Sequence, residues 1–158
     1  MSASPSAQLR QAWEKLSPMP AGKQLFSALF GRLVPYTGSI KPLILELRPG
    51  YAKLQLRDRR AVRNHLNSIH AIALMNLGEA TSGLAMNVGL PPSARAIVKG
   101  LSIEYLKKAR GTITAECESP IPDGSASEEL TIEAVMRDEA GEVVATMKAL
   151  WLVGPKPA

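Results

Sequence analysis

The sequence has few of the features that define several common protein classes. It contains one cysteine, Cys117, so neither an intrachain disulfide framework nor a cysteine-rich metal site can form. Phe, Trp and Tyr make up only 4% of the residues, which argues against modules that stack nucleic-acid bases on aromatic side chains. No apolar run is long enough to span a membrane, and the N-terminal segment lacks the basic and apolar regions of a secretory signal. We therefore expect a globular, cytoplasmic protein.

The charge is unevenly distributed along the chain. The 158 residues include 19 Lys and Arg and 14 Asp and Glu, which gives a net charge of +5. Residues 1–110 hold 16 of the basic residues and 5 of the acidic ones, whereas residues 111–158 hold 3 and 9. A basic first part is compatible with nucleic acid, a membrane surface or a phosphorylated small molecule as the partner.

Periodicity and turn residues predict a single α+β unit with a real core. The expected order is two helices (residues 8–16 and 21–34), two strands (41–48 and 51–58), a polar loop (59–69), a long helix (70–88) and four strands (95–108, 112–118, 129–138 and 143–152). Short connections favour antiparallel pairing of the last four strands. We assign residues 1–39 to an N-terminal helical extension and residues 40–158 to the main domain. The aromatic residues of the extension could cap the sheet or cover a pocket: Trp13, Phe26 and Phe30.

The predicted long helix is thin and almost entirely apolar. It contains no proline, and small residues recur along it: Ala71, Ala73, Gly78, Ala80, Ser82, Gly83 and Ala85. A helix that is apolar nearly all round is buried on most sides. Small side chains let a sheet approach its backbone closely, so we expect the sheet to curl around this helix.

Polar residues concentrate at the start of this helix and at one position inside it. Both histidines of the chain, His65 and His70, lie close to Asn64 at the helix start. Glu79 lies within the helix, where a carboxylate is costly unless it is paired or faces a cavity. Nine residues separate His70 from Glu79, which places them roughly 13 Å apart along the axis and on nearly opposite faces. A site that uses both residues would need two subunits.

Structural roles for these residues are open alternatives. Three polar neighbours could satisfy the Glu79 carboxylate: Asn76, Thr81 and Ser82. His70 could be only a helix-start residue, with Ser68 or Asn67 as the N-cap. The spacing of the histidines and the acid matches no zinc pattern, so we expect no metal ion.

The segment from Asn64 to Ala71, with the helix that follows, resembles the active-site region of hotdog-fold acyl-CoA thioesterases. The resemblance is strongest to the phenylacetate-pathway type and an uncharacterised branch related to it. That pattern has an Asn, a His at the helix start and an acidic residue nine positions after the His, and Asn64, His70 and Glu79 match it. The resemblance covers residues 40–153. It departs at Ala71 and Ile72, where the family commonly has two glycines, and Ile72 could narrow the approach to the site.

The resemblance implies an acyl-CoA thioesterase that forms a homodimer or a dimer of dimers, with its site between subunits. Glu79 of one subunit would act as a general base on water or as a nucleophile on the thioester carbonyl. A backbone N–H of Ala71 or Ile72 in the other subunit would polarise the carbonyl oxygen. Asn64 would orient water or substrate, and His70 would position the loop or bind the thioester end.

Basic residues near the predicted site could attract the phosphates of coenzyme A. Arg60 and Arg63 belong to a cluster that precedes the site, and Lys107 and Lys108 belong to a cluster on or after the predicted strand 95–108. Ser82 could line the pocket or merely pack. Coenzyme A is part of the substrate in this scheme, so we expect no separate cofactor.

Three other functions are open. A non-catalytic acyl-CoA or acyl-lipid binding protein of the same fold is favoured by Ala71 and Ile72 in place of glycines. A nucleic-acid-binding protein would use the basic part of the chain, although aromatic platforms are scarce. A hotdog dehydratase or hydratase would need a His–acid pair on one substrate carbon, and the Asn, His, Glu order suits thioester hydrolysis better.

Overall fold

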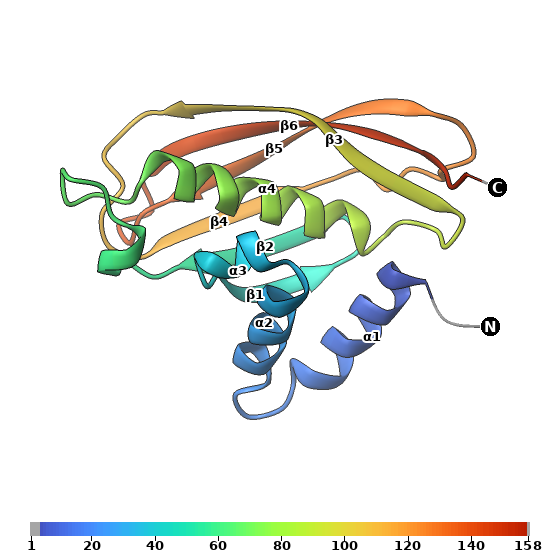
Figure 1. The fold of residues 1–158 in the computed structure, drawn as a ribbon, viewed down its shortest axis with the longest axis horizontal. Helices are drawn as coiled ribbons and strands as arrows, with labels where there is room; N and C mark the ends of the chain where they lie inside the picture. Colours follow the sequence, from blue (N-terminus) through green and yellow to red (C-terminus); the bar gives the residue numbers. More distant parts are fainter. Residues whose placement is uncertain (1–3, 158) are drawn as a thin grey trace.

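The computed structural model describes residues 4–157 and shows a six-stranded antiparallel sheet curved around one long helix (Figure 1). The order across the sheet is β1-β2-β4-β5-β6-β3. The strands are β1 (Leu43–Arg48), β2 (Tyr51–Leu56), β3 (Ala94–Tyr105), β4 (Ile113–Glu118), β5 (Glu128–Arg137) and β6 (Val143–Pro155). The helix α4 (Ala71–Asn87) contacts every strand, so the expected α+β arrangement is confirmed.

Close packing of α4 on the sheet depends on its small residues. A Cβ atom on Gly78 would lie 2.7 Å from Cε of Met136 and 2.9 Å from Cε of Met147, closer than carbon atoms pack. Leu77, next to Gly78, is fully buried. Gly78 therefore marks a position at which the sheet packs directly against the backbone of α4.

Three helices precede the sheet: α1 (Pro5–Leu16), α2 (Gly22–Leu33) and α3 (Pro35–Ser39). Helix α1 begins three residues earlier than its periodicity predicts, because the Ser4 side chain accepts a hydrogen bond from the Ala7 N–H (3.2 Å) and Pro5 fits the first turn. The short helix α3 was not predicted. The rings of Trp13 and Phe26 hold α1 against α2 in an edge-to-face contact, with centroids 5.1 Å apart.

The strand boundaries differ from the prediction by one to three residues, and most at two ends. Strand β3 stops at Tyr105 instead of residue 108, because Leu106 and Lys107 both donate their N–H groups to the Val144 carbonyl and leave the regular ladder. Strand β6 continues to Pro155, which pairs with Ala94. The predicted loop contains a single helical turn, η1 (Arg60–Val62).

Strand β3 forms one edge of the sheet and presents large apolar side chains to solvent. Ile97 and Tyr105 are exposed by 48% and 47%, and Leu101 lies between them on the strand. A long apolar edge strand offers unpaired backbone groups to another strand.

Within residues 4–157, no helix is long and apolar enough to cross a membrane.

Candidate active site

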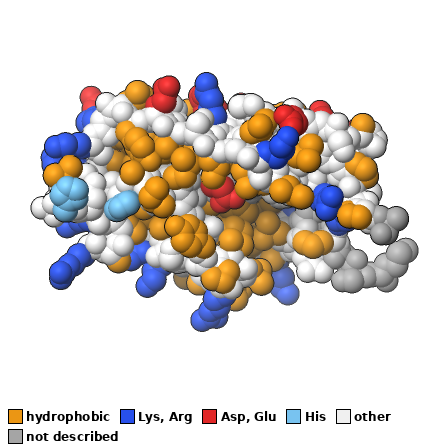
Figure 2. Space-filling view, turned by 45° about the horizontal axis from the view of Figure 1, so that its top comes forward, with side chains coloured by type: hydrophobic (Ala, Val, Ile, Leu, Met, Phe, Trp, Pro, Cys, Tyr) orange, Lys and Arg blue, Asp and Glu red, His pale blue; other side chains and the backbone are white. Residues whose placement is uncertain are grey.

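Glu79 lies in the middle of α4 and lines a cavity of about 360 Å³, which we call the Glu79 cavity. Its other walls come from α1, α2, α3 and β6, with mainly apolar side chains such as Leu9, Phe30 and Trp151. Figure 2 shows an acidic side chain in the middle of a hydrophobic face, beside a hollow. The carboxylate is half-buried in these surroundings.

None of the three predicted neighbours satisfies the Glu79 carboxylate. The Asn76 amide donates to the Tyr36 carbonyl (3.1 Å), and the Thr81 hydroxyl donates to the Leu77 carbonyl (2.6 Å). Ser82 is fully buried and donates to the main-chain carbonyl of Glu79 (3.0 Å), away from the cavity. No partner of the carboxylate lies among residues 4–157, and burial raises the pKa of Glu79 above its ordinary value.

At the start of α4, His70 itself is the N-cap, instead of Ser68 or Asn67. Its Nδ1 accepts a hydrogen bond from the Ile72 N–H (3.1 Å), which satisfies one of the free donors of the first turn. Of the two predicted carbonyl-binding N–H groups, that of Ile72 is therefore already occupied, and that of Ala71 is left for a ligand. The Tyr105 hydroxyl donates to the Ala71 carbonyl (2.9 Å) and ties β3 to the helix start.

The side chain of Asn64 holds the preceding loop in shape. Its Oδ1 accepts hydrogen bonds from the Leu66 N–H (2.9 Å), the Ser68 N–H (3.2 Å) and the Ser68 hydroxyl (3.2 Å). With its oxygen saturated in this way, Asn64 has only its amide N–H groups to offer a substrate.

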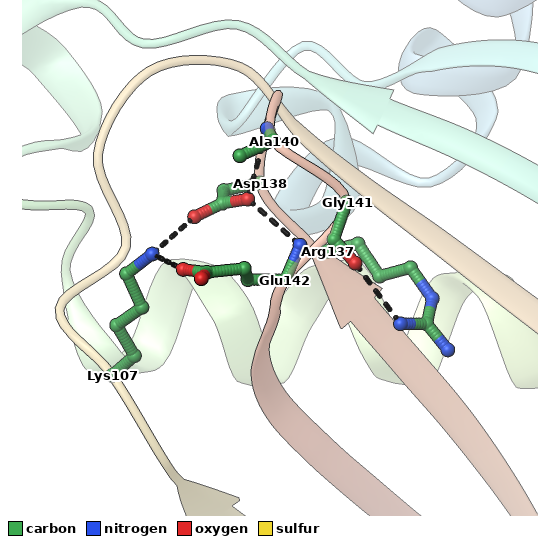
Figure 3. A network of polar contacts seen from close by, with 6 residues as sticks. All are labelled: Lys107, Arg137, Asp138, Ala140, Gly141 and Glu142. Atoms are coloured by element: carbon green, nitrogen blue, oxygen red, sulfur yellow. Dashed lines mark hydrogen bonds and ion pairs between the residues drawn. The ribbon is translucent and has the colours of Figure 1, made fainter.

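The basic residues predicted to hold coenzyme A fall into two groups. Arg63 pairs with Asp58 (2.5 Å), and Lys107 pairs with both Asp138 (2.8 Å) and Glu142 in the turn between β5 and β6 (Figure 3). The hydrogen bond from Lys107 lowers the pKa of Asp138. Arg60 and Lys108 have no ion-pair partner within the described part of the chain. The unpaired cations are therefore freer to bind phosphate.

The structure separates the predicted residues into two places. A second cavity, of about 380 Å³, is lined by Asn64, Ala71, Lys107 and Lys108, whereas Glu79 lines the first. Eight residues of α4 separate Ala71 from Glu79, about 12 Å along the axis. The two places cannot act on one carbonyl within a single chain, so the shared site between subunits stays a prediction.

Sequence reasoning missed Trp151, on the wall of the Glu79 cavity. Its indole Nε1–H is the one buried side-chain polar group in residues 4–157 that has no hydrogen-bond partner. The one sequence signal for Trp151 is a single tryptophan within an alternating strand pattern. The sequence leaves two roles open for the aromatic residues of the N-terminal helices, capping the sheet or covering a pocket. Phe30 lines the Glu79 cavity, whereas Trp13 and Phe26 are buried in the core. No three His, Cys, Asp or Glu of the described chain lie close enough together to hold a metal ion.

Comparison with known proteins shows that the chain belongs to the family DUF4442 (domain of unknown function), which matches residues 22–153. It is 33% identical to the structural-genomics protein APC5556, over 96% of this chain and 99% of that one, with a TM-score of 0.81. It is 23% identical to a Pseudomonas aeruginosa protein of unknown function described as a "Probable Thioesterase", over 87% and 97% of the two chains, with a TM-score of 0.74. A phenylacetic acid degradation-related protein of Ralstonia eutropha is 14% identical over 75% and 89%, with a TM-score of 0.64.

No curated protein matches the chain. The solved structures confirm the hotdog fold and place thioesterase-type proteins among the structural relatives.

Proposed function

We propose that this protein is an acyl-CoA thioesterase in which Glu79 activates the attacking water. One observation carries the proposal: the Glu79 carboxylate lies half-buried in an apolar cavity and has no hydrogen-bond or ion-pair partner within residues 4–157. A half-buried carboxylate without a partner reduces stability, and its raised pKa makes it a stronger base than an ordinary carboxylate.

In this mechanism, Glu79 takes a proton from water while the hydroxide oxygen bonds to the thioester carbonyl carbon. The negative charge then develops on the carbonyl oxygen, which accepts a hydrogen bond from the Ala71 N–H at the start of α4 in a second copy of the chain. When the carbon–sulfur bond breaks, the proton on Glu79 passes to the thiolate, so a carboxylic acid and free coenzyme A leave. Direct attack by the Glu79 carboxylate, followed by hydrolysis of the anhydride, is the second route.

The edge of the sheet supports a homodimer. Strand β3 runs for 12 residues along the edge, and Tyr105, near its end, contacts Ala71 at the start of α4. Pairing of β3 with its counterpart in a second copy would cover the apolar side chains of the edge. It would also bring each helix start towards the other copy, as a shared site requires. We expect light scattering to give at least twice the mass of one chain.

The first test is Glu79→Gln, which keeps the size of the side chain and removes its basicity. We expect hydrolysis, measured by free-thiol release across a panel of acyl-CoA esters, to fall by about 10²- to 10⁴-fold. Glu118→Gln, at an exposed position at the end of β4, is the matched control and should retain activity. Turnover like that of the wild type in Glu79→Gln would exclude Glu79 from the chemistry.

One observation favours a binding protein as the second candidate. Because His70 occupies the Ile72 N–H, only the Ala71 N–H of the two predicted donors is left to stabilise the oxyanion. A protein that binds acyl-CoA tightly and releases no thiol would fit this alternative, and Glu79→Gln would then leave its affinity unchanged or improved.

A further inference from the structure

The Glu79 cavity adjoins a further apolar cavity between the N-terminal helices. This further cavity has a volume of about 570 Å³ and lies between α1 and α2. The two cavities share four lining residues: Pro5, Leu9, Phe30 and Leu33. We call these two adjoining cavities together the N-terminal groove.

The groove is open near α4 and closed at its other end. Helices α1 and α2 meet at the loop that joins them and diverge towards α4 (Figure 1). At the closed end, the Trp13 and Phe26 rings pack edge to face and fill the space between the helices. From Leu33 to Phe26, the seven residues of α2 rise about 10 Å, which is the length of roughly eight extended methylene groups.

The walls of the groove are mainly apolar, and several of their side chains are exposed. Leu33 is 77% exposed and Leu29 is 40% exposed, although both lie beside other apolar side chains. Besides Glu79, Arg32 is the charged side chain among the described residues that line the groove. Contiguous apolar surface of this kind marks a binding site for an apolar ligand or partner.

Two residues of the Glu79 cavity carry a polar group without a partner among residues 4–157. They are Glu79, through its carboxylate, and Trp151, which is 5% exposed and whose buried indole N–H is unpaired. A protein surface seated along the whole groove would bury the Glu79 carboxylate further, which is costly unless that surface supplies a partner for it. A single hydrocarbon chain ending in a polar thioester would fill the narrow apolar end and bring a reactive group to the carboxylate.

We propose that the N-terminal groove binds the acyl chain of a straight-chain acyl thioester of medium length. The thioester lies at Glu79, the chain passes between Leu9 and Phe30, and its methyl end meets the Trp13–Phe26 pair. The assignment of the thioester end rests on the proposed function, whereas the binding of the chain does not. The helical extension is then the part of the molecule that sets chain-length preference.

The test compares two leucines of the same helix. Leu29→Asp places a charge in the groove, and Leu25→Asp places the same charge one turn away, at a position that is 49% exposed and outside the groove. We expect Leu29→Asp to lower kcat/KM for octanoyl-CoA at least tenfold and to leave acetyl-CoA unchanged. Leu25→Asp should alter neither substrate.

Three results would overturn the proposal: equal losses on both substrates, equal losses in both variants, or a wild-type preference for acetyl-CoA. A dimer that dissociates in Leu29→Asp, seen by light scattering, would identify the face as an interface between copies instead. If wild type hydrolyses no ester, the proposed function fails and the groove is tested by calorimetric titration with octanoyl-CoA and with coenzyme A alone. Binding of octanoyl-CoA that weakens at least tenfold in Leu29→Asp supports the groove, and unchanged binding excludes it.

Discussion

The start and the middle of α4 both carry polar residues of the candidate site, but only those at the start have hydrogen-bond partners for their side chains. At the start, the side chains of His70 and Asn64 are hydrogen-bonded within their own loop and helix turn. In the middle, Glu79 has apolar walls around it and no partner within residues 4–157. The polar side chains of the first region have hydrogen-bond partners within the chain, whereas the Glu79 carboxylate of the second has none.

This difference separates residues that shape the site from the residue that acts in it. Saturated groups hold a loop and a helix end in place, and their removal leaves backbone donors without acceptors. A half-buried carboxylate without a partner destabilises the fold and is retained only if something else requires it. Removing polar groups from the two regions should therefore change stability in opposite directions.

The largest loss of stability is expected at the helix start, from Asn64→Ala. This change removes one acceptor that serves three donors, so we expect the free energy of unfolding to fall by about 2 kcal/mol. Asn64→Asp keeps the acceptor oxygen and should restore most of the loss. Urea unfolding measures both variants, and a loss in Asn64→Ala below about 0.5 kcal/mol would show that the loop does not depend on this side chain.

A rise in the free energy of unfolding is expected in the middle of the helix, from Glu79→Gln. Burial raises the pKa of Glu79, so the folded state binds its proton more tightly than the unfolded state does. The wild type therefore loses stability as the pH rises from below the ordinary value of 4.5 through the raised pKa. The Gln variant lacks this loss and should gain on the order of 1 kcal/mol at neutral pH.

At a pH well below the ordinary carboxyl range the gain should disappear, because Glu79 is then protonated in both states. Urea unfolding of wild type and variant across this pH range provides the measurement. A variant that is less stable than the wild type at neutral pH would mean that the carboxylate has a partner, such as one supplied by a second copy.

A smaller loss is expected from His70→Ala, which removes the N-cap of α4. Loss of a cap typically costs about 0.5 to 1 kcal/mol, and the Ile72 N–H would lose its acceptor. His70→Asn offers a cap of its own and should recover stability. If Asn is no better than Ala in thermal unfolding, the ring of His70 matters for a reason other than capping.

Much of the fold is readable from the sequence because it depends on local patterns. The alternation in the strands and the small residues of α4 predict their elements to within a few residues. The early end of β3 was not predicted, because it depends on the Val144 carbonyl, far along the chain. The short helix α3 was not predicted either, and its distant contact is the hydrogen bond from the Asn76 amide to the Tyr36 carbonyl.

The candidate site is less readable, because its chemistry depends on which groups find partners. The sequence singles out Glu79, His70 and Asn64 but cannot show that His70 caps its own helix or that Ser82 faces the core. Nor does it show that the wall opposite Glu79 comes from α1 and α2, because an amphipathic helix does not specify what its apolar face will contact.

The smallest effect is expected on substrate binding, at the two adjacent lysines after β3. One of these lysines has ion-pair partners and the other has none among the described residues. Lys107 is held by Asp138 and Glu142 (Figure 3). Lys108 has no ion-pair partner among the described residues, although both lysines line the same cavity. We expect Lys108→Ala to raise KM for an acyl-CoA ester by roughly threefold, since an exposed charge contact contributes less than about 1 kcal/mol. Lys107→Ala removes the same charge but no free donor, so its effect on KM should be smaller and should vanish as added salt screens the field. An equal rise in both variants at every salt concentration would mean that coenzyme A displaces the two carboxylates from Lys107, and that this network opens when substrate binds.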